Sequence, residues 1–167
     1  MDSTPAANRG ARHDRARERQ ASDCRRSCRG PRRVTTYVDS SALIKLYVRE
    51  ADSADAAEIL NADPVLVTSW LTHVEVRRNL ARLLEGVTLR RAQEVFEHDL
   101  DCMAMVNPDE RMWRAAADIA EHLGVRTLDA VHLGTAQHLR IPSLTFCTFD
   151  LRQGQAARQL GMHVLGC

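Results

Sequence analysis

Short apolar runs alternate with longer amphipathic stretches from Val34 to the end of the chain. The short runs are rich in β-branched and aromatic residues, which predicts buried strands. The longer stretches repeat apolar residues three and four positions apart, which predicts helices. We expect strands at 34–38, 65–68, 105–106, 144–149 and 162–165, and helices at 40–48, 54–60, 88–105, 108–123, 128–139 and 151–160. A further helix is expected to be capped by Ser69 or Thr72 and to run to about Leu84.

Helical crossovers between successive strands imply a parallel sheet that is covered on both faces. We therefore expect an α/β fold of three layers, α/β/α, with a central parallel sheet of four to five strands. Within it, Thr88 and Thr127 are the predicted N-caps of two helices, and Gly86 and Gly124 are predicted to end two others. Such sheets place their functional sites beyond the carboxyl ends of the strands.

Charge divides the chain into two parts. Residues 1–33 contain ten Arg and four acidic residues, net +6, so the remaining residues hold 13 basic and 18 acidic residues, net −5. The first part lacks apolar periodicity, and we expect it to be disordered; residues 34–167 are expected to form one domain. The Arg-rich segment has three interpretations. It fits an RNA-binding arm, or a targeting peptide, although its four acids argue against the latter. In the third interpretation the start is misassigned and Val34 is the true first residue.

The chain contains no apolar run long enough to cross a membrane, and its first residues lack the apolar stretch of a secretory signal. Its five cysteines are an odd number at irregular spacing, which fits reduced thiols better than a disulfide framework. We therefore expect a soluble, cytoplasmic protein with no membrane partner.

Four acidic residues stand where predicted strands or helices open onto one face of this fold: Asp39, Glu75, Asp129 and Asp150. Two unit charges about 4 Å apart repel by roughly 4 kcal/mol near a protein surface, so converging carboxylates favour a bound cation. Hard cations such as Mg²⁺ and Mn²⁺ prefer oxygen ligands. Taken singly, each acid also has an ordinary reading, such as a helix N-cap for Asp39 or a turn residue for Asp150.

Four segments of the chain resemble the PIN domain, and specifically the VapC-type toxins of bacterial toxin-antitoxin pairs. They are VDSSALIKLYVRE (38–50), TSWLTHVEVRRNL (68–80), RTLDAVHLGTAQHL (126–139) and TFDLRQGQAARQLGM (148–162). The resemblance spans about residues 34–165. It implies a metal-dependent endoribonuclease that cuts cellular RNA, tRNA or rRNA, and that is neutralised by a small VapB-type antitoxin. It also implies a homodimer.

By position, the four acids look like the acidic quartet of that family. Asp39 sits at a strand end and is expected to be a direct metal ligand, with Asp129 and Asp150 binding directly or through water. Glu75 is expected to orient or deprotonate the attacking water. Ser41 and Thr148 are expected to hydrogen-bond a carboxylate or a metal water. Some members carry a further acid soon after the last one; Leu151, Arg152 and Gln153 occupy that stretch here.

Other polar and aromatic residues have less specific patterns. His132 is expected on the helical face of Asp129, either touching the site or hydrogen-bonding behind it. Lys45 is expected to face solvent, and Trp70 and Trp113 are expected in the core or in a dimer contact. Five arginines are candidates for an RNA-binding rim: Arg77, Arg78, Arg82, Arg90 and Arg91.

Two other functions compete with the ribonuclease. A phosphoryl-transfer domain needs a Lys near a late strand end or an Asp-x-Asp motif, and the only lysine is Lys45, while Asp39 is followed by two serines. The non-enzymatic alternative is an antitoxin-binding partner without catalysis, acting in a complex that binds operator DNA and represses its own synthesis. The intact acidic quartet argues against the loss of catalysis.

Overall fold

The computed structural model describes residues 34–62 and 65–167, and the strands of this part run parallel in one sheet. The expectations for residues 1–33 lie outside the described residues. The strands follow the spatial order β3-β2-β1-β4-β5, which confirms the predicted parallel sheet. They are β1 (Thr35–Val38), β2 (Val65–Ser69), β3 (Ala104–Val106), β4 (Thr145–Cys147) and β5 (His163–Leu165).

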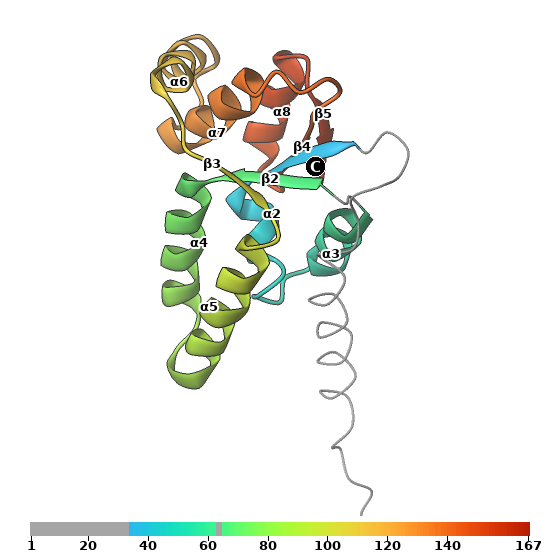
Figure 1. Ribbon diagram of the computed structural model, residues 1–167, viewed down its shortest axis with the longest axis vertical. Helices are drawn as coiled ribbons and strands as arrows, with labels where there is room; N and C mark the ends of the chain where they lie inside the picture. Colours follow the sequence, from blue (N-terminus) through green and yellow to red (C-terminus); the bar gives the residue numbers. More distant parts are fainter. Residues whose placement is uncertain (1–33, 63–64) are drawn as a thin grey trace, which may run out of the picture. The chain divides into compact units, whose positions relative to one another are not determined.

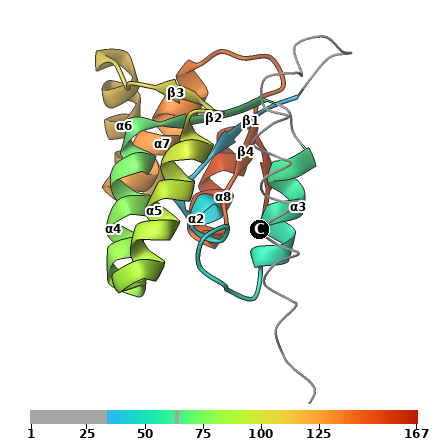
Figure 2. The same cartoon turned by 60° about the horizontal axis from the view of Figure 1, so that its bottom comes forward.

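Helices cover the sheet on both faces, as expected for three layers (Figure 1). One face is covered by α2 (Ser40–Ile44), α3 (Ser53–Ala62), α4 (Trp70–Leu83) and α5 (Gly86–Leu100). The other is covered by α6 (Glu110–Leu123), α7 (Thr127–His138) and α8 (Leu151–Gln159). Figure 2 shows the two helical layers from a second direction. No helix in the described ranges combines the length and apolar character needed to cross a bilayer.

Successive side chains of β1 point into two separate hydrophobic cores, one on each face of the sheet. Tyr37 packs with α6, α7 and α8, and its ring stacks on that of Phe146 at 5.5 Å between centroids. Val38 points the other way, into the core that Leu80 and Phe96 help to form. Because successive side chains of a strand point to opposite faces, Asp39 follows on the Tyr37 side of the sheet.

The central strand β1 lies between β2 and β4, so the chain changes direction across the sheet at this point. In open parallel sheets such a switch leaves a crevice beyond the carboxyl ends of the strands. Asp39 directly follows β1, and Asp150 follows β4 by three residues. The topology therefore brings two of the predicted acids to one edge.

Several predicted helix ends are wrong. Helix α5 begins at Gly86 with Glu85 as its N-cap and ends at Leu100, so Gly86 starts this helix instead of ending the previous one, and Thr88 is not a cap. Arg126, not Thr127, is the N-cap of α7. Gly124 does end α6 in the left-handed region, at φ 63, as predicted. The errors arise because a polar residue near a helix start resembles a cap whether or not its side chain bonds the backbone.

Helix α2 is also shorter than predicted, because regular helix stops at Ile44 and turns continue the chain to Val48. This change accompanies the burial of Lys45, which was expected to face solvent but is only 9% exposed. Its Nζ lies 2.6 Å from Glu50 Oε2 and 5.0 Å from the centre of the Phe149 ring. The pattern failed here because a long side chain on a polar helix face can fold back onto nearby acids.

Both tryptophans lie at the surface. Trp70, at the start of α4, and Trp113, in α6, are each 51% exposed, so the expectation of a core position is wrong for both. Val74 lies one turn after Trp70 and is also exposed. The dimer contact expected for these tryptophans stays a prediction.

Candidate metal centre

Asp39 is the most buried of the four predicted acids, at 4% exposure. Its backbone N–H donates to the carbonyl of Cys147 at 3.0 Å, which ties it to β4. Its Oδ2 accepts the backbone N–H of Ser41 at 2.9 Å, so it is also the N-cap of α2. The structural and functional readings of Asp39 are therefore compatible, because one oxygen caps the helix and the other faces the site.

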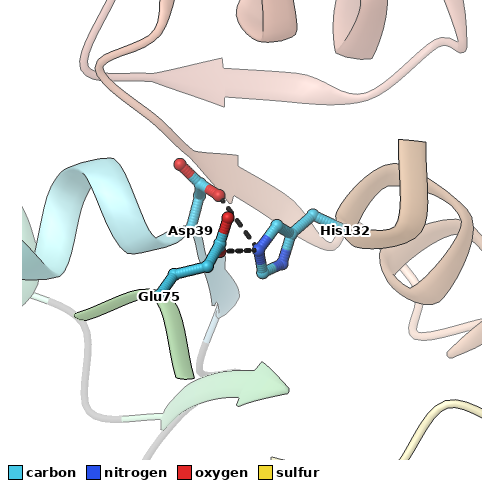
Figure 3. A group of neighbouring side chains, drawn as sticks. All are labelled: Asp39, Glu75 and His132. Atoms are coloured by element: carbon cyan, nitrogen blue, oxygen red, sulfur yellow. Dashed lines mark hydrogen bonds and ion pairs between the residues drawn. The ribbon is translucent and has the colours of Figure 1, made fainter. Parts of the chain in front are cut away.

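Glu75 and His132 meet Asp39 from opposite helical layers (Figure 3). The Nε2 atom of His132, in α7, lies 2.7 Å from Glu75 Oε2, in α4, and 3.4 Å from Asp39 Oδ1. An ionised carboxylate only accepts hydrogen bonds, so His132 Nε2 carries the proton of this contact. His132 is thus part of the acidic site and does not simply pack behind it.

The other ring nitrogen of His132 is held by Tyr37. The hydroxyl oxygen of Tyr37 lies 2.9 Å from His132 Nδ1, and burial raises the pKa of Tyr37, so the phenol stays neutral. Sequence reasoning missed Tyr37. The available signal was the strand period of two, which places Tyr37 and Asp39 on one face of β1.

The pKa of His132 is set by two opposing effects. Complete burial disfavours the charged imidazolium, but the negative charges of Asp39 and Glu75, and the hydrogen bond to Glu75, outweigh burial and raise the pKa of His132. The carboxylates thereby favour a positive charge between them.

Asp129 lies in the first turn of α7, three residues before His132. Burial raises its pKa to about 6, and the neighbouring charges of Asp150 and Asp39 act in the same direction, whereas Arg126 opposes them. Burial is the largest cause of the rise, and repulsion by the other acids adds to it.

Asp150 is the N-cap of α8, and its Oδ1 accepts the backbone N–H groups of Arg152 and Gln153 at 2.8 and 3.1 Å. Its position after β4 puts Asp150 at the same edge of the sheet as Asp39, and its charge acts to raise the pKa of Asp129. As with Asp39, the cap leaves a second carboxylate oxygen available to the site.

Ser41 and Thr148 both lie beside Asp39. Thr148 Oγ1 is 3.3 Å from Asp39 Oδ2 and 3.1 Å from Ser41 Oγ, and Ser41 Oγ accepts the backbone N–H of Phe149 at 2.8 Å. The shortest contact of Thr148 is with Gln153, at 2.6 Å between Oγ1 and Oε1. Gln153 was not among the predicted site residues, although it occupies the stretch where an additional acid had been considered.

The side chains fit a divalent cation. The carboxylate oxygens of Asp39 and Glu75 and the nitrogen of His132 lie within 4.8 Å of one another; because His132 Nε2 donates to Glu75, the two carboxylates are the groups of this set that could bind an ion. Two of the three are carboxylates, the hard oxygen ligands that Mg²⁺ and Mn²⁺ prefer. The predicted metal set was Asp39, Asp129 and Asp150; in the described part of the chain the acids that come together with a third possible ligand are instead Asp39 and Glu75, with His132. The charges of Asp150, Asp39 and Glu75 all act to raise the pKa of Asp129.

The five arginines of the expected RNA-binding rim do not form a uniform set. Arg77 donates to Glu97 Oε1 at 2.8 Å, and with His73 it lowers the pKa of Glu97 despite the opposing effect of burial. Arg78, Arg82, Arg90 and Arg91 are exposed. Arg77 therefore has a structural partner within the α4–α5 pair.

The fold and the acidic edge define a parallel α/β domain with a candidate metal centre. The sequence pattern of the PIN domain matches residues 36–159. Ribonuclease VapC46 of Mycobacterium tuberculosis is 38% identical over 129 residues, covering 77% of this chain and 95% of that protein. The chain therefore belongs to the PIN domain family and is similar to its VapC-type members.

Solved structures agree with this fold. VapC20 of Mycobacterium tuberculosis, described as a sarcin-ricin loop cleaving toxin, has a TM-score of 0.60 at 18% identity and covers 72% of this chain and 94% of its own. DNA-bound VapBC from Salmonella typhimurium has a TM-score of 0.58 at 15% identity, covering 78% of this chain and 96% of its own. At these identities the likeness concerns the fold.

Proposed function

We propose that this protein is a metal-dependent endoribonuclease toxin of the VapC type. The single observation that carries the proposal is the convergence of Asp39, Glu75 and His132 at the carboxyl edge of the sheet, with the raised pKa of Asp129 beside them. A domain that gathers repelling carboxylates gains from binding a cation there. The similarity to ribonuclease VapC46 supports RNA as the substrate class.

Asp39, Asp129 and Asp150 are the proposed metal-holding residues. The caps that bind one oxygen of Asp39 and of Asp150 fix both carboxylates before any ion arrives. Mg²⁺ or Mn²⁺ would supply Lewis-acid activation of a water and neutralise charge on the scissile phosphate.

Glu75 is the proposed residue that orients or deprotonates the attacking water. His132 holds the Glu75 carboxylate through Nε2, and Tyr37 in turn holds His132 through Nδ1. Ser41 and Thr148 limit the movement of Asp39. In-line attack by water would leave a 3′-hydroxyl and a 5′-phosphate, which distinguishes this reaction from cleavage by the ribose 2′-hydroxyl.

The proposed partners are a cognate VapB-type antitoxin, cellular RNA such as tRNA or rRNA, and a second copy of the chain. The fold shared with VapBC assemblies is compatible with an antitoxin partner. Trp70, Val74 and Trp113 are exposed apolar side chains that would suit a homodimer contact. We place the protein in the cytoplasm, where these RNAs are found.

The test is cleavage of total cellular RNA by the purified chain with Mn²⁺ or Mg²⁺, compared with excess EDTA. Discrete fragments that carry 5′-phosphates and disappear with EDTA are the expected result. Asp39→Asn is the matched control, because an Asn side chain can still cap α2 but carries no negative charge.

The outcome against the proposal is a folded, Mn²⁺-binding protein that cleaves neither tRNA nor rRNA. It would favour the alternative of a non-catalytic antitoxin-binding partner in a DNA-binding, autoregulatory complex. Binding of an operator fragment by the complex with antitoxin would then be the relevant assay.

A further inference from the structure

Gln153 is a fully buried polar side chain between two acids of the proposed centre. Its backbone N–H donates to Asp150 Oδ1 at 3.1 Å, and its side-chain Nε2 lies 3.3 Å from Asp39 Oδ1. A buried amide without partners is costly, so these contacts decide whether Gln153 is tolerated. One residue thus touches both Asp39 and Asp150.

The orientation of the Gln153 amide follows from its neighbours. The carboxylate of Asp39 can only accept, so the amide must present Nε2 to it. Oε1 then faces Thr148, whose hydroxyl lies 2.6 Å away and donates to it. A flipped amide would place its oxygen against the Asp39 carboxylate and lose that bond, which favours the arrangement with Nε2 toward Asp39.

Thr148 extends the chain of hydrogen bonds. Its Oγ1 accepts the backbone N–H of Asp150 at 3.1 Å, and its single proton is committed to Gln153 at the much shorter distance. The donors therefore run in one direction, from the Asp150 backbone through Thr148 and Gln153 to Asp39 Oδ1. The contact of Thr148 with Asp39 Oδ2, at 3.3 Å, is longer and competes for the same proton.

We propose that Gln153 is a positioning residue that fixes the Asp39 carboxylate relative to Asp150 and thereby sets the affinity of the centre for its metal. This inference rests on the proposed function and adds a residue to it. An amide can do what a further acid at this place could not, because it donates to Asp39 and adds no negative charge to the cluster.

The experiment compares Mn²⁺ binding by the full chain, followed by the EPR signal of free Mn²⁺, in wild type, Gln153→Met and Gln155→Met. Methionine keeps the length of glutamine but cannot donate, and Gln155 is an exposed glutamine of the same helix. We expect Gln153→Met to weaken Mn²⁺ binding by about 10- to 100-fold, the range for residues that orient metal ligands. Gln155→Met should bind as wild type does.

A second measurement needs neither metal nor a substitution of Gln153. In EDTA, the side-chain amide protons of Gln153 in wild type should exchange slowly with solvent, unlike those of Gln155, and Asp39→Ala should shift their NMR signals. Fast exchange in folded wild type would overturn the hydrogen-bond chain.

The two proposals fail in different ways. Wild type that binds Mn²⁺ while Gln153→Met binds it equally well overturns the role of Gln153 and leaves the metal centre intact. Wild type that binds no Mn²⁺ overturns the metal centre, and the affinity effect with it. A urea unfolding curve of each variant in EDTA shows whether the variant is folded, and so distinguishes weaker Mn²⁺ binding from a loss of the fold.

Discussion

The imidazole of His132 bridges two helical layers by donating from Nε2 to Glu75, 2.7 Å away, while Tyr37 holds its other nitrogen. Glu75 comes from α4 and His132 from α7, on opposite faces of the sheet. This contact makes the position of the proposed water-orienting carboxylate depend on the packing of both layers.

Replacing His132 by Phe should keep the ring in place but remove both hydrogen bonds. We expect RNA cleavage in saturating Mn²⁺ to fall by about 10- to 100-fold, because Glu75 loses the group that orients it. Initial rates on a defined RNA fragment measure the effect. His122→Phe is the control, since His122 is an exposed histidine of α6; an equal loss in both variants would contradict the role of His132.

Asp39→Asn should abolish cleavage and metal binding together. A metal ion contributes several kcal/mol to such reactions, so we expect the rate to fall by more than about 100-fold. Ligand at about 100 times its Kd stabilises a folded protein by about 2.7 kcal/mol, and this Mn²⁺-dependent shift of the melting temperature should be absent in the variant. A variant that still shows the full shift would exclude Asp39 as a metal ligand.

The raised pKa of Asp129 predicts how stability depends on pH in the absence of metal. Folding favours the protonated carboxyl, so the contribution of Asp129 is complete below about pH 4, its unfolded pKa, and is lost as the pH rises through about 6. His132 acts in the same direction above about pH 6.5, because its pKa is also raised.

Urea unfolding in EDTA between pH 4 and 7 measures this dependence. Wild type should lose stability relative to Asp129→Asn across that window. In excess Mn²⁺ the wild-type trend should reverse, since a metal requires deprotonated ligands. If the free energy of unfolding of the two proteins in EDTA changed with pH in the same way, the pKa of Asp129 would not be raised in the folded protein.

The sequence was sufficient to predict the layers of the fold, because strand and helix periods differ sharply and the βα alternation permits few topologies. It also predicted that Asp39 and Asp150 follow strands, which the structure confirms for β1 and β4. The particular contacts were not predictable. Whether Glu75 meets His132 depends on how α4 and α7 pack across the sheet, and no local pattern encodes that distance.

Gln153 shows a second limit of the sequence. In the sequence it is one of several polar residues of a predicted helix, and only the packing of α8 against the sheet buries it beside Asp39. The tryptophans mislead in the opposite direction, because large apolar residues are usually buried, yet Trp70 and Trp113 are half exposed.

The crossing of α6 and α7 gives a prediction that does not involve metal ligands. A methyl group at Gly134 would lie 2.8 Å from the backbone nitrogen of Ala116 and 2.9 Å from the carbonyl oxygen of Met112. Backbone atoms cannot move aside as side chains do, so Gly134→Ala should destabilise the protein by about 1–3 kcal/mol, despite the better helix propensity of alanine.

The same substitution should also weaken Mn²⁺ binding, because α7 carries both Asp129 and His132. Chemical unfolding in EDTA and Mn²⁺ titration measure the two effects separately. Gln137→Ala is the control, at an exposed position of α7. Gly134→Ala with unchanged stability would mean that the two helices can separate at no cost.

Substitution of Lys45 tests how much a buried ammonium group contributes to stability when its acidic partners are exposed to solvent. Glu50 and Asp52 are 40% and 54% exposed, so both can be rehydrated once Lys45 is replaced. Lys45→Met keeps the apolar stem over Phe149, and we expect a loss of only about 0.2–1 kcal/mol, as for exposed ion pairs. Urea unfolding at low and high salt measures it, with Arg49→Met as an exposed control. Because salt screens such pairs, the difference from wild type should shrink at high salt; a loss of several kcal/mol that salt leaves unchanged would mean that the burial of Lys45, and not its ion pairs, governs this corner of the fold.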